Sequence, residues 1–80
     1  MDHAEENRVT LNPKVMAGKP VIRGTRIPVE LIVWMLAQGI PEADILQEYP
    51  RLQSEDVRAA LGYAARVLAD EDVFPINAAP

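Results

Sequence analysis

The feature that most constrains this chain is an unbroken run of seven apolar residues at positions 31–37 (LIVWMLA), which contains the only tryptophan, Trp34. Signals at both ends favour a helix. The proline–valine pair at 28–29 suits a helix start, and Gly39 suits a left-handed helix end. The β-branched residues within the run make a strand the alternative. A helix that is apolar on every side has to be enclosed by the rest of its domain, so we expect Trp34 and Met35 to lie in the core.

The length of the chain limits what it can do. Eighty residues form one domain near the lower end of the size that folds alone, and a second chain often completes so small a core. The 49% hydrophobic content is too high for a disordered chain. Little chain is left for a deep walled pocket, so we do not expect an enzyme.

Three observations predict a cytoplasmic protein. There is no cysteine, which excludes disulfides and thiolate metal sites and fits a reducing compartment. The first eight residues (MDHAEENR) are polar and acidic, unlike a signal peptide. The apolar run is much shorter than the roughly 20 residues that span a bilayer, so no membrane association is expected.

A basic block at 23–26 (RGTR) separates two short apolar arms at 20–22 and 27–29. Gly24, taken as the first central residue of a two-residue loop, suits a type II′ turn. The proline in each arm removes a backbone donor, which limits the arms to edge or very short strands. Together with the alternating segment at 8–11 (RVTL), these arms predict a short N-terminal β-hairpin or a small sheet.

Two further helices follow. Pro41 suits the first helical position of the second helix, and Pro50 ends it. Ser54 is a good N-cap for the third helix, and acidic residues follow it in the first turn. Gly62 in the middle of this helix costs roughly 1 kcal/mol relative to alanine, which predicts a close approach of another backbone. The third helix has an apolar stripe that continues to about Ala69 and consists of Val57, Ala60, Leu61, Ala64, Val67 and Leu68.

The second and third helices have the spacing of a helix-turn-helix. In this interpretation Val57 and Leu61 hold the third helix against the second, and Gln53, Glu55 and Arg58 face a DNA groove. The alternative is a pair of helices that only pack together, and the acidic Glu55 favours that alternative because it repels phosphate.

Charge is divided unevenly along the chain, whose net charge is −4. Residues 1–28 hold five basic and three acidic side chains, whereas residues 29–80 hold three basic and nine acidic ones. The basic tip with Lys19, Arg23 and Arg26 suits phosphate contacts, or else only shields an edge strand. The acidic part suits a basic protein partner, or else serves solubility alone.

No pattern of catalytic chemistry was found. The sequence contains no phosphate-binding loop, no Ser/His/Asp set and no paired carboxylates at a defined spacing. His3, the only histidine, lies in the polar N-terminal tail without a second ligand nearby. We therefore predict no catalytic residue, no metal site and no cofactor.

Several blocks together resemble the small bacterial proteins grouped as domain-of-unknown-function family 433, over about residues 9–76. The resemblance is carried by Lys19-Pro20-x-Ile22-x-Gly24-Thr25-Arg26-Ile27-Pro28-Val29, by Gly39, by Ile45-Leu46-x-x-Tyr49-Pro50-x-Leu52, and by Asp56-Val57-x-Ala59-Ala60-Leu61-x-Tyr63-Ala64. It implies a mainly α fold, a three-helix homeodomain-like helix-turn-helix with the β element at its N-terminus, and a homodimer. We expect one domain at 9–69 between a disordered tail at 1–8 and an acidic tail at 70–80.

The resemblance also implies a function, the antitoxin of a type II toxin–antitoxin pair similar to VapB-type antitoxins. Its partners would be a PIN-like ribonuclease toxin and its own operator DNA, bound as a dimer. The alternative is a protein-interaction module that kept the helix-turn-helix fold and does not read DNA. The expected DNA-binding residues are Lys19, Arg23, Thr25, Arg26, Gln53, Ser54 and Arg58. The expected toxin contacts are Asp72, Val73, Phe74 and Ile76.

Overall fold

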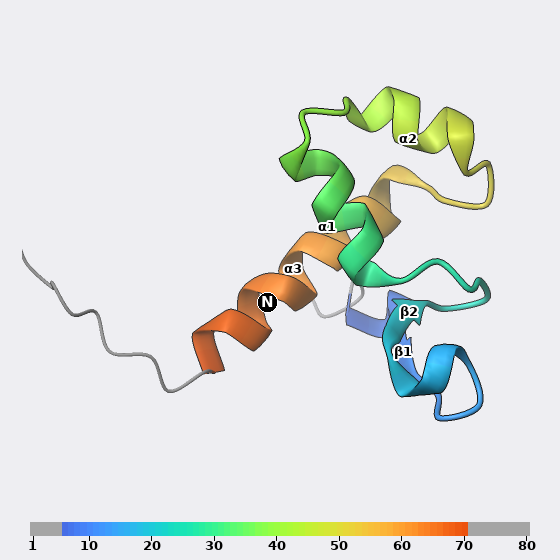
Figure 1. Cartoon of the computed structure of the whole chain (residues 1–80), viewed down its shortest axis with the longest axis vertical. Helices are drawn as coiled ribbons and strands as arrows, with labels where there is room; N and C mark the ends of the chain where they lie inside the picture. The colour runs from blue at the N-terminus through green and yellow to red at the C-terminus, as the bar shows by residue number, and fades with distance from the viewer. Residues whose placement is uncertain (1–5, 71–80) are drawn as a thin grey trace, which may run out of the picture.

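The computed structural model describes residues 6–70 of the chain. In this range the fold is mainly helical, with three α-helices and a two-stranded antiparallel sheet near the N-terminus (Figure 1). This confirms the expected fold class. The elements in order are η1 (Glu6–Arg8), β1 (Val9–Leu11), η2 (Met16–Gly18), β2 (Pro20–Ile22), α1 (Val29–Ala37), α2 (Glu42–Glu48) and α3 (Ser54–Asp70). No helix within residues 6–70 is both long enough and apolar enough to cross a membrane.

The sheet pairs β1 with β2 inside one chain. Val9 lies opposite Ile22, and the Arg23 N–H donates to the Arg8 carbonyl at 2.6 Å, which extends the ladder by one step. The segment at 27–29 adds only an isolated bridge to β2. The expected hairpin between the two apolar arms is therefore only a single antiparallel bridge, between Val21 and Pro28. The second arm cannot extend further as a strand because it leads directly into α1.

The turn after β2 is of type II and not of type II′. The Thr25 N–H donates to the Ile22 carbonyl at 3.0 Å, so Arg23 and Gly24 are the two central residues of the turn. Gly24 has a φ of +82° at the second central position, which is the position where a type II turn needs a positive φ. The turn thus begins one residue earlier than the sequence pattern suggested.

The ends of α1 lie where the sequence placed them. Pro28 is the extended N-cap residue. Gly39 has a φ of +86°, and its N–H donates to the Leu36 carbonyl, while the Ile40 N–H donates to the Met35 carbonyl. These two bonds form a Schellman motif, which satisfies carbonyls that have no partner within the helix.

Only one side of α1 is enclosed. Val29, Ile32 and Met35 are buried, which confirms the expectation for Met35, whereas Trp34 is 58% exposed. The expected burial of Trp34 is wrong, because 3.6 residues per turn place residue 34 roughly opposite residue 32. The other elements cover the Ile32 side alone. The core consists of Ile22, Val29, Ile32, Met35, Ile45, Leu52, Val57 and Ala60.

The start of α3 is capped by Asp56 and not by Ser54. An oxygen of the buried Asp56 carboxylate accepts a hydrogen bond from the Gln53 N–H at 2.8 Å, as the acid of a capping box does. The Ser54 hydroxyl instead donates to the Glu42 carboxylate at 2.7 Å and ties α3 to α2. The prediction of Ser54 as N-cap is therefore wrong.

The second half of α3 projects from the body of the domain, as its orange-to-red end shows (Figure 1). Val57 and Ala60 are buried, but Leu61 is 43% exposed and does not hold α3 against α2 as expected. Apart from those of its own helix, no atom of residues 6–70 lies within 4 Å of a Cβ placed at Gly62, so the predicted close approach of another backbone is wrong for this part of the chain. The apolar stripe continues along the helix beyond the point where the other elements of residues 6–70 cover it.

Candidate nucleic-acid interface and an apolar groove

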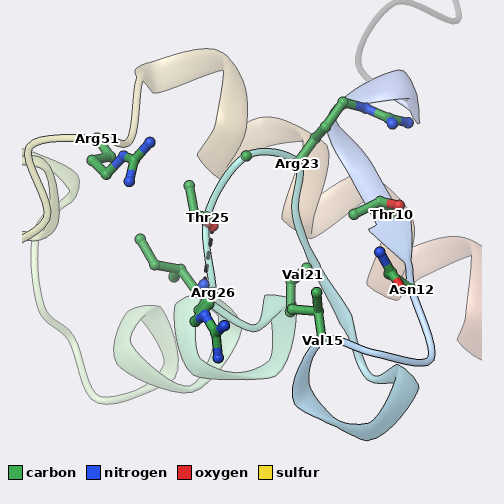
Figure 2. A pocket seen from close by; sticks show the side chains of 10 residues that line it. Thr10, Asn12, Val15, Val21, Arg23, Thr25, Arg26 and Arg51 are labelled. Carbon is green, nitrogen blue, oxygen red and sulfur yellow. Dashed lines mark hydrogen bonds between the residues drawn. The ribbon is translucent and has the colours of Figure 1, made fainter.

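An open hollow of about 620 Å³ lies beside the type II turn (Figure 2). Three arginines from two distant segments, Arg23, Arg26 and Arg51, stand around it. No acidic residue of the described range 6–70 lines it. The remaining lining residues are Thr10, Asn12, Val15, Val21, Gly24, Thr25 and Ile27. The hollow is therefore a cationic concavity on the N-terminal side of the domain.

Local structure places each arginine. Arg23 is a central residue of the turn and Arg26 directly follows it, so both side chains leave the tip. Arg51 lies between Pro50, just after the end of α2, and the buried Leu52, whose N–H donates to the Tyr49 carbonyl at 2.9 Å. Sequence reasoning did not select Arg51, because only the packing of the α2–α3 turn against the basic tip brings it there.

The three guanidinium groups do not converge on one point. Figure 2 shows Arg23 and Arg51 on opposite sides of the turn, with Arg26 below it. Arg23 Nε donates to the Asn7 carbonyl at 2.6 Å. No hydrogen bond or ion pair joins Arg26 or Arg51 to another residue within 6–70. Cations spaced around a rim suit successive phosphates of a nucleic acid better than one small anion.

A second hollow of about 380 Å³ continues from the first to the start of α3. Arg23 and Arg51 line both hollows, and Gln53 and Asp56 bring the second to the helix N-terminus. Arg8 lies in the second hollow and contacts the Asp56 carboxylate at 3.0 Å. The negative charge of Asp56 is therefore matched by a cation. Among residues 6–70, the unpaired charges that line the two adjoining hollows are positive.

Of the other predicted DNA contacts, Lys19 and Arg58 lie outside both hollows. Lys19 Nζ is 2.8 Å from a carboxylate oxygen of Glu30 on α1, in an exposed ion pair. Arg58 is exposed on α3. Neither residue belongs to the arginine rim, which we define as Arg23, Arg26 and Arg51 around the first hollow. Lys19 is also already paired with an acid.

The remaining three have different surroundings. The Thr25 hydroxyl donates to the Ile22 carbonyl at 2.7 Å and accepts from the Ile27 N–H at 3.0 Å, so it holds the turn. The Ser54 hydroxyl is bound to Glu42. The Gln53 side chain is exposed in the second hollow, where Oε1 is 3.5 Å from Arg8. The expected toxin contacts Asp72, Val73, Phe74 and Ile76 lie outside the described residues.

A separate apolar groove of about 450 Å³ runs between α1 and α3. Trp34 and Leu68, which are 58% and 66% exposed, lie on its two sides. The residues within 6–70 that line it are Pro20, Val29, Glu30, Val33, Trp34, Ala37, Tyr63, Ala64, Val67 and Leu68. Contiguous exposed apolar surface of this kind marks an interaction site on a protein. Periodicity found the apolar residues, but it did not reveal that this part of them stays uncovered.

Side chains that could hold a metal ion do not cluster in the described part of the chain. Among residues 6–70, no group of three His, Asp or Glu side chains comes together. The two surfaces offer charge complementarity at the arginine rim and apolar contact in the groove.

Comparison with known proteins places this fold among its relatives. The family model described as "Protein of unknown function (DUF433)" matches residues 9–64. The uncharacterized protein y4eO of Sinorhizobium fredii (strain NBRC 101917 / NGR234) is 39% identical over 56 residues, which cover 70% of this chain and 25% of that protein. The crystal structure of a DUF433 member protein from Anabaena variabilis ATCC 29413 has a TM-score of 0.74 and 38% identity, over 79% of this chain and 62% of that one. The chain thus spans a quarter of the first relative and less than two thirds of the second.

Proposed function

The chain belongs to the DUF433 family, and we propose that it is the cytoplasmic antitoxin of a type II toxin–antitoxin pair. In this proposal it binds a PIN-like ribonuclease toxin and, as a dimer, its own operator DNA. The observation that carries the DNA-binding part is the arginine rim, in which Arg26 and Arg51 have no acidic partner within residues 6–70 and Arg23 stands beside them. The proposed kind of toxin, a PIN-like ribonuclease, comes from the resemblance of this chain to VapB-type antitoxins.

The position of the rim supports nucleic-acid binding. In a helix-turn-helix, the N-terminal residues of the recognition helix approach the base edges while flanking groups hold the phosphates. Here α3 would be the recognition helix, and the two hollows bring Arg23 and Arg51 to its N-terminus. Because Arg8 pairs with Asp56, the start of α3 is less repulsive to phosphate than its sequence suggests.

The toxin-binding part rests on a different region. The segment with Asp72, Val73, Phe74 and Ile76 combines acidic and apolar side chains, which suits a basic nuclease surface with apolar pockets. We assign the toxin contact to this segment and the DNA contact to the arginine rim, so the two partners would use different residues of the chain.

Two experiments test the function. In a mobility-shift assay with the DNA upstream of the gene, we expect a shift that strengthens when the toxin is added and weakens as salt is raised. In the second, the chain and the product of the neighbouring gene are co-expressed, and we expect them to purify together. Loss of both results rejects the proposal.

The second candidate is a protein-interaction module that does not read DNA. The net charge of −4 and the exposed apolar groove between α1 and α3 favour it. It predicts co-purification with a protein partner and no DNA shift at any salt concentration. A loss of operator affinity on Arg58→Ala would count against this candidate. Arg58 is the cation that the outer face of α3 would present to a groove of the DNA.

A further inference from the structure

The outer side of α1 is apolar and has no cover within residues 6–70. Trp34 is 58% exposed, and Val33 and Ala37 stand beside it on the same wall of the groove. An indole in contact with water lacks the stabilisation that a large aromatic side chain gains when it is buried in a core or an interface. This surface accounts for the otherwise unexplained apolar character of α1 on all sides.

The opposite wall of the groove belongs to a helix that extends past the domain. α3 has 17 residues and is therefore about 25 Å long, and its second half projects from the other elements (Figure 1). Val67 and Leu68 on this half are 41% and 66% exposed. Each copy of the chain thus offers both an apolar groove and a projecting apolar helix end.

From these observations we propose that the groove is the interface with a second copy of this chain. The projecting end of α3 from each copy lies against Trp34 of the other, around a two-fold axis. Such an arrangement is isologous: Trp34 of one copy meets Leu68 of the other, and the same contact recurs with the roles exchanged. The proposal gives a surface to the dimer of the proposed function, but it rests on the groove and not on DNA or toxin binding.

The charge of the groove selects this occupant over the others. Among the described residues that line it, Glu30 alone is charged, and Lys19 pairs with it at 2.8 Å. Two copies that each carry a net charge of −4 repel one another, so they need a contact surface that adds no further like charge. A basic nuclease or a nucleic acid would gain no electrostatic attraction from this neutral surface.

Trp34 makes the interface directly measurable, because it is the only tryptophan in the chain. The full chain is examined by sedimentation equilibrium and by tryptophan emission over the same range of concentrations. We expect a dimer with blue-shifted emission at high concentration. On dilution, the fall to the monomer mass and the red shift should share one midpoint.

Leu68→Glu is the test variant, and Leu11→Glu is its matched control. Both leucines are exposed, at 66% and 57%, so neither substitution opens the core, and circular dichroism checks that both variants fold. Leu68→Glu places an unpaired carboxylate in the interface twice, and we expect the dimer to weaken by about 100-fold or more. Leu11 lies on β1 and does not itself line the groove, although its strand partner Pro20 does, so Leu11→Glu should change the midpoint far less than Leu68→Glu.

Three results would overturn the proposal. They are a monomer at every concentration, a dimer that Leu68→Glu leaves unchanged, and a monomer whose emission is already blue-shifted because its own C-terminal segment fills the groove. Operator binding and toxin co-purification are separate readouts, so failure of this interface can be told apart from failure of the proposed function.

Discussion

The guanidinium of Arg8 lies 3.0 Å from the carboxylate of Asp56, across 48 residues of sequence. The same carboxylate accepts the Gln53 N–H at 2.8 Å. One buried acid therefore caps α3 and ties it to the residue that precedes β1. This contact fixes the start of α3 relative to the sheet, and Arg23 is positioned from the same edge of the sheet.

Asp56→Ala should lower the free energy of unfolding by about 1–3 kcal/mol, because it removes the helix cap and leaves the Gln53 N–H without its acceptor. Asp56→Asn keeps an acceptor for that N–H and should cost less. Urea denaturation followed by circular dichroism measures both variants. Equal losses for the two would show that the charge pairing with Arg8, and not the cap, dominates.

Gly62→Ala should raise the free energy of unfolding by about 0.5–1 kcal/mol. Gly62 lies within α3 with open space around it, so alanine gains helix propensity without a clash. Gly39→Ala is the control and should be destabilising by about 1–2 kcal/mol, because Gly39 has a φ of +86°. Destabilisation by Gly62→Ala would mean that a backbone does approach this position in solution.

Substitutions on the two sides of α1 should differ in their cost. Ile32→Ala should lower the free energy of unfolding by about 2–5 kcal/mol, since Ile32 is fully buried. Trp34→Ala should cost much less at concentrations low enough to keep the chain monomeric, since Trp34 is mostly exposed. Thermal denaturation at micromolar and lower concentrations makes the comparison. If Trp34→Ala lowered the free energy of unfolding by several kcal/mol at these low protein concentrations, the exposed position of the indole would be contradicted.

Arg51→Ala should weaken operator binding and reduce the slope of log K against log salt by about one, as the loss of one phosphate contact does. Lys19→Ala removes the same charge from a residue that is already paired with Glu30, and it should leave the slope nearly unchanged. A salt series of mobility shifts measures both. If both variants lower the slope equally, net charge controls binding and the rim has no special role.

Much of the fold could be predicted because its signals are local. The cap of α1 at Gly39, the end of α2 before Pro50 and the family blocks depend on backbone geometry within a few residues. The same reasoning failed where two local solutions compete. Ser54 suits an N-cap as well as Asp56 suits a capping box, and the neighbouring Glu42 decides between them by binding the Ser54 hydroxyl.

The sequence by itself therefore determined which segments are helical, where α1 ends and that a basic tip precedes it. Only the tertiary structure decided that Arg51 joins that tip and that Trp34 faces outward. The physical reason is that hydrophobic periodicity identifies apolar residues but not which of them the rest of the chain can reach. In a chain this short, the elements of residues 6–70 that pack on α1 cover one side of it and leave the other side exposed.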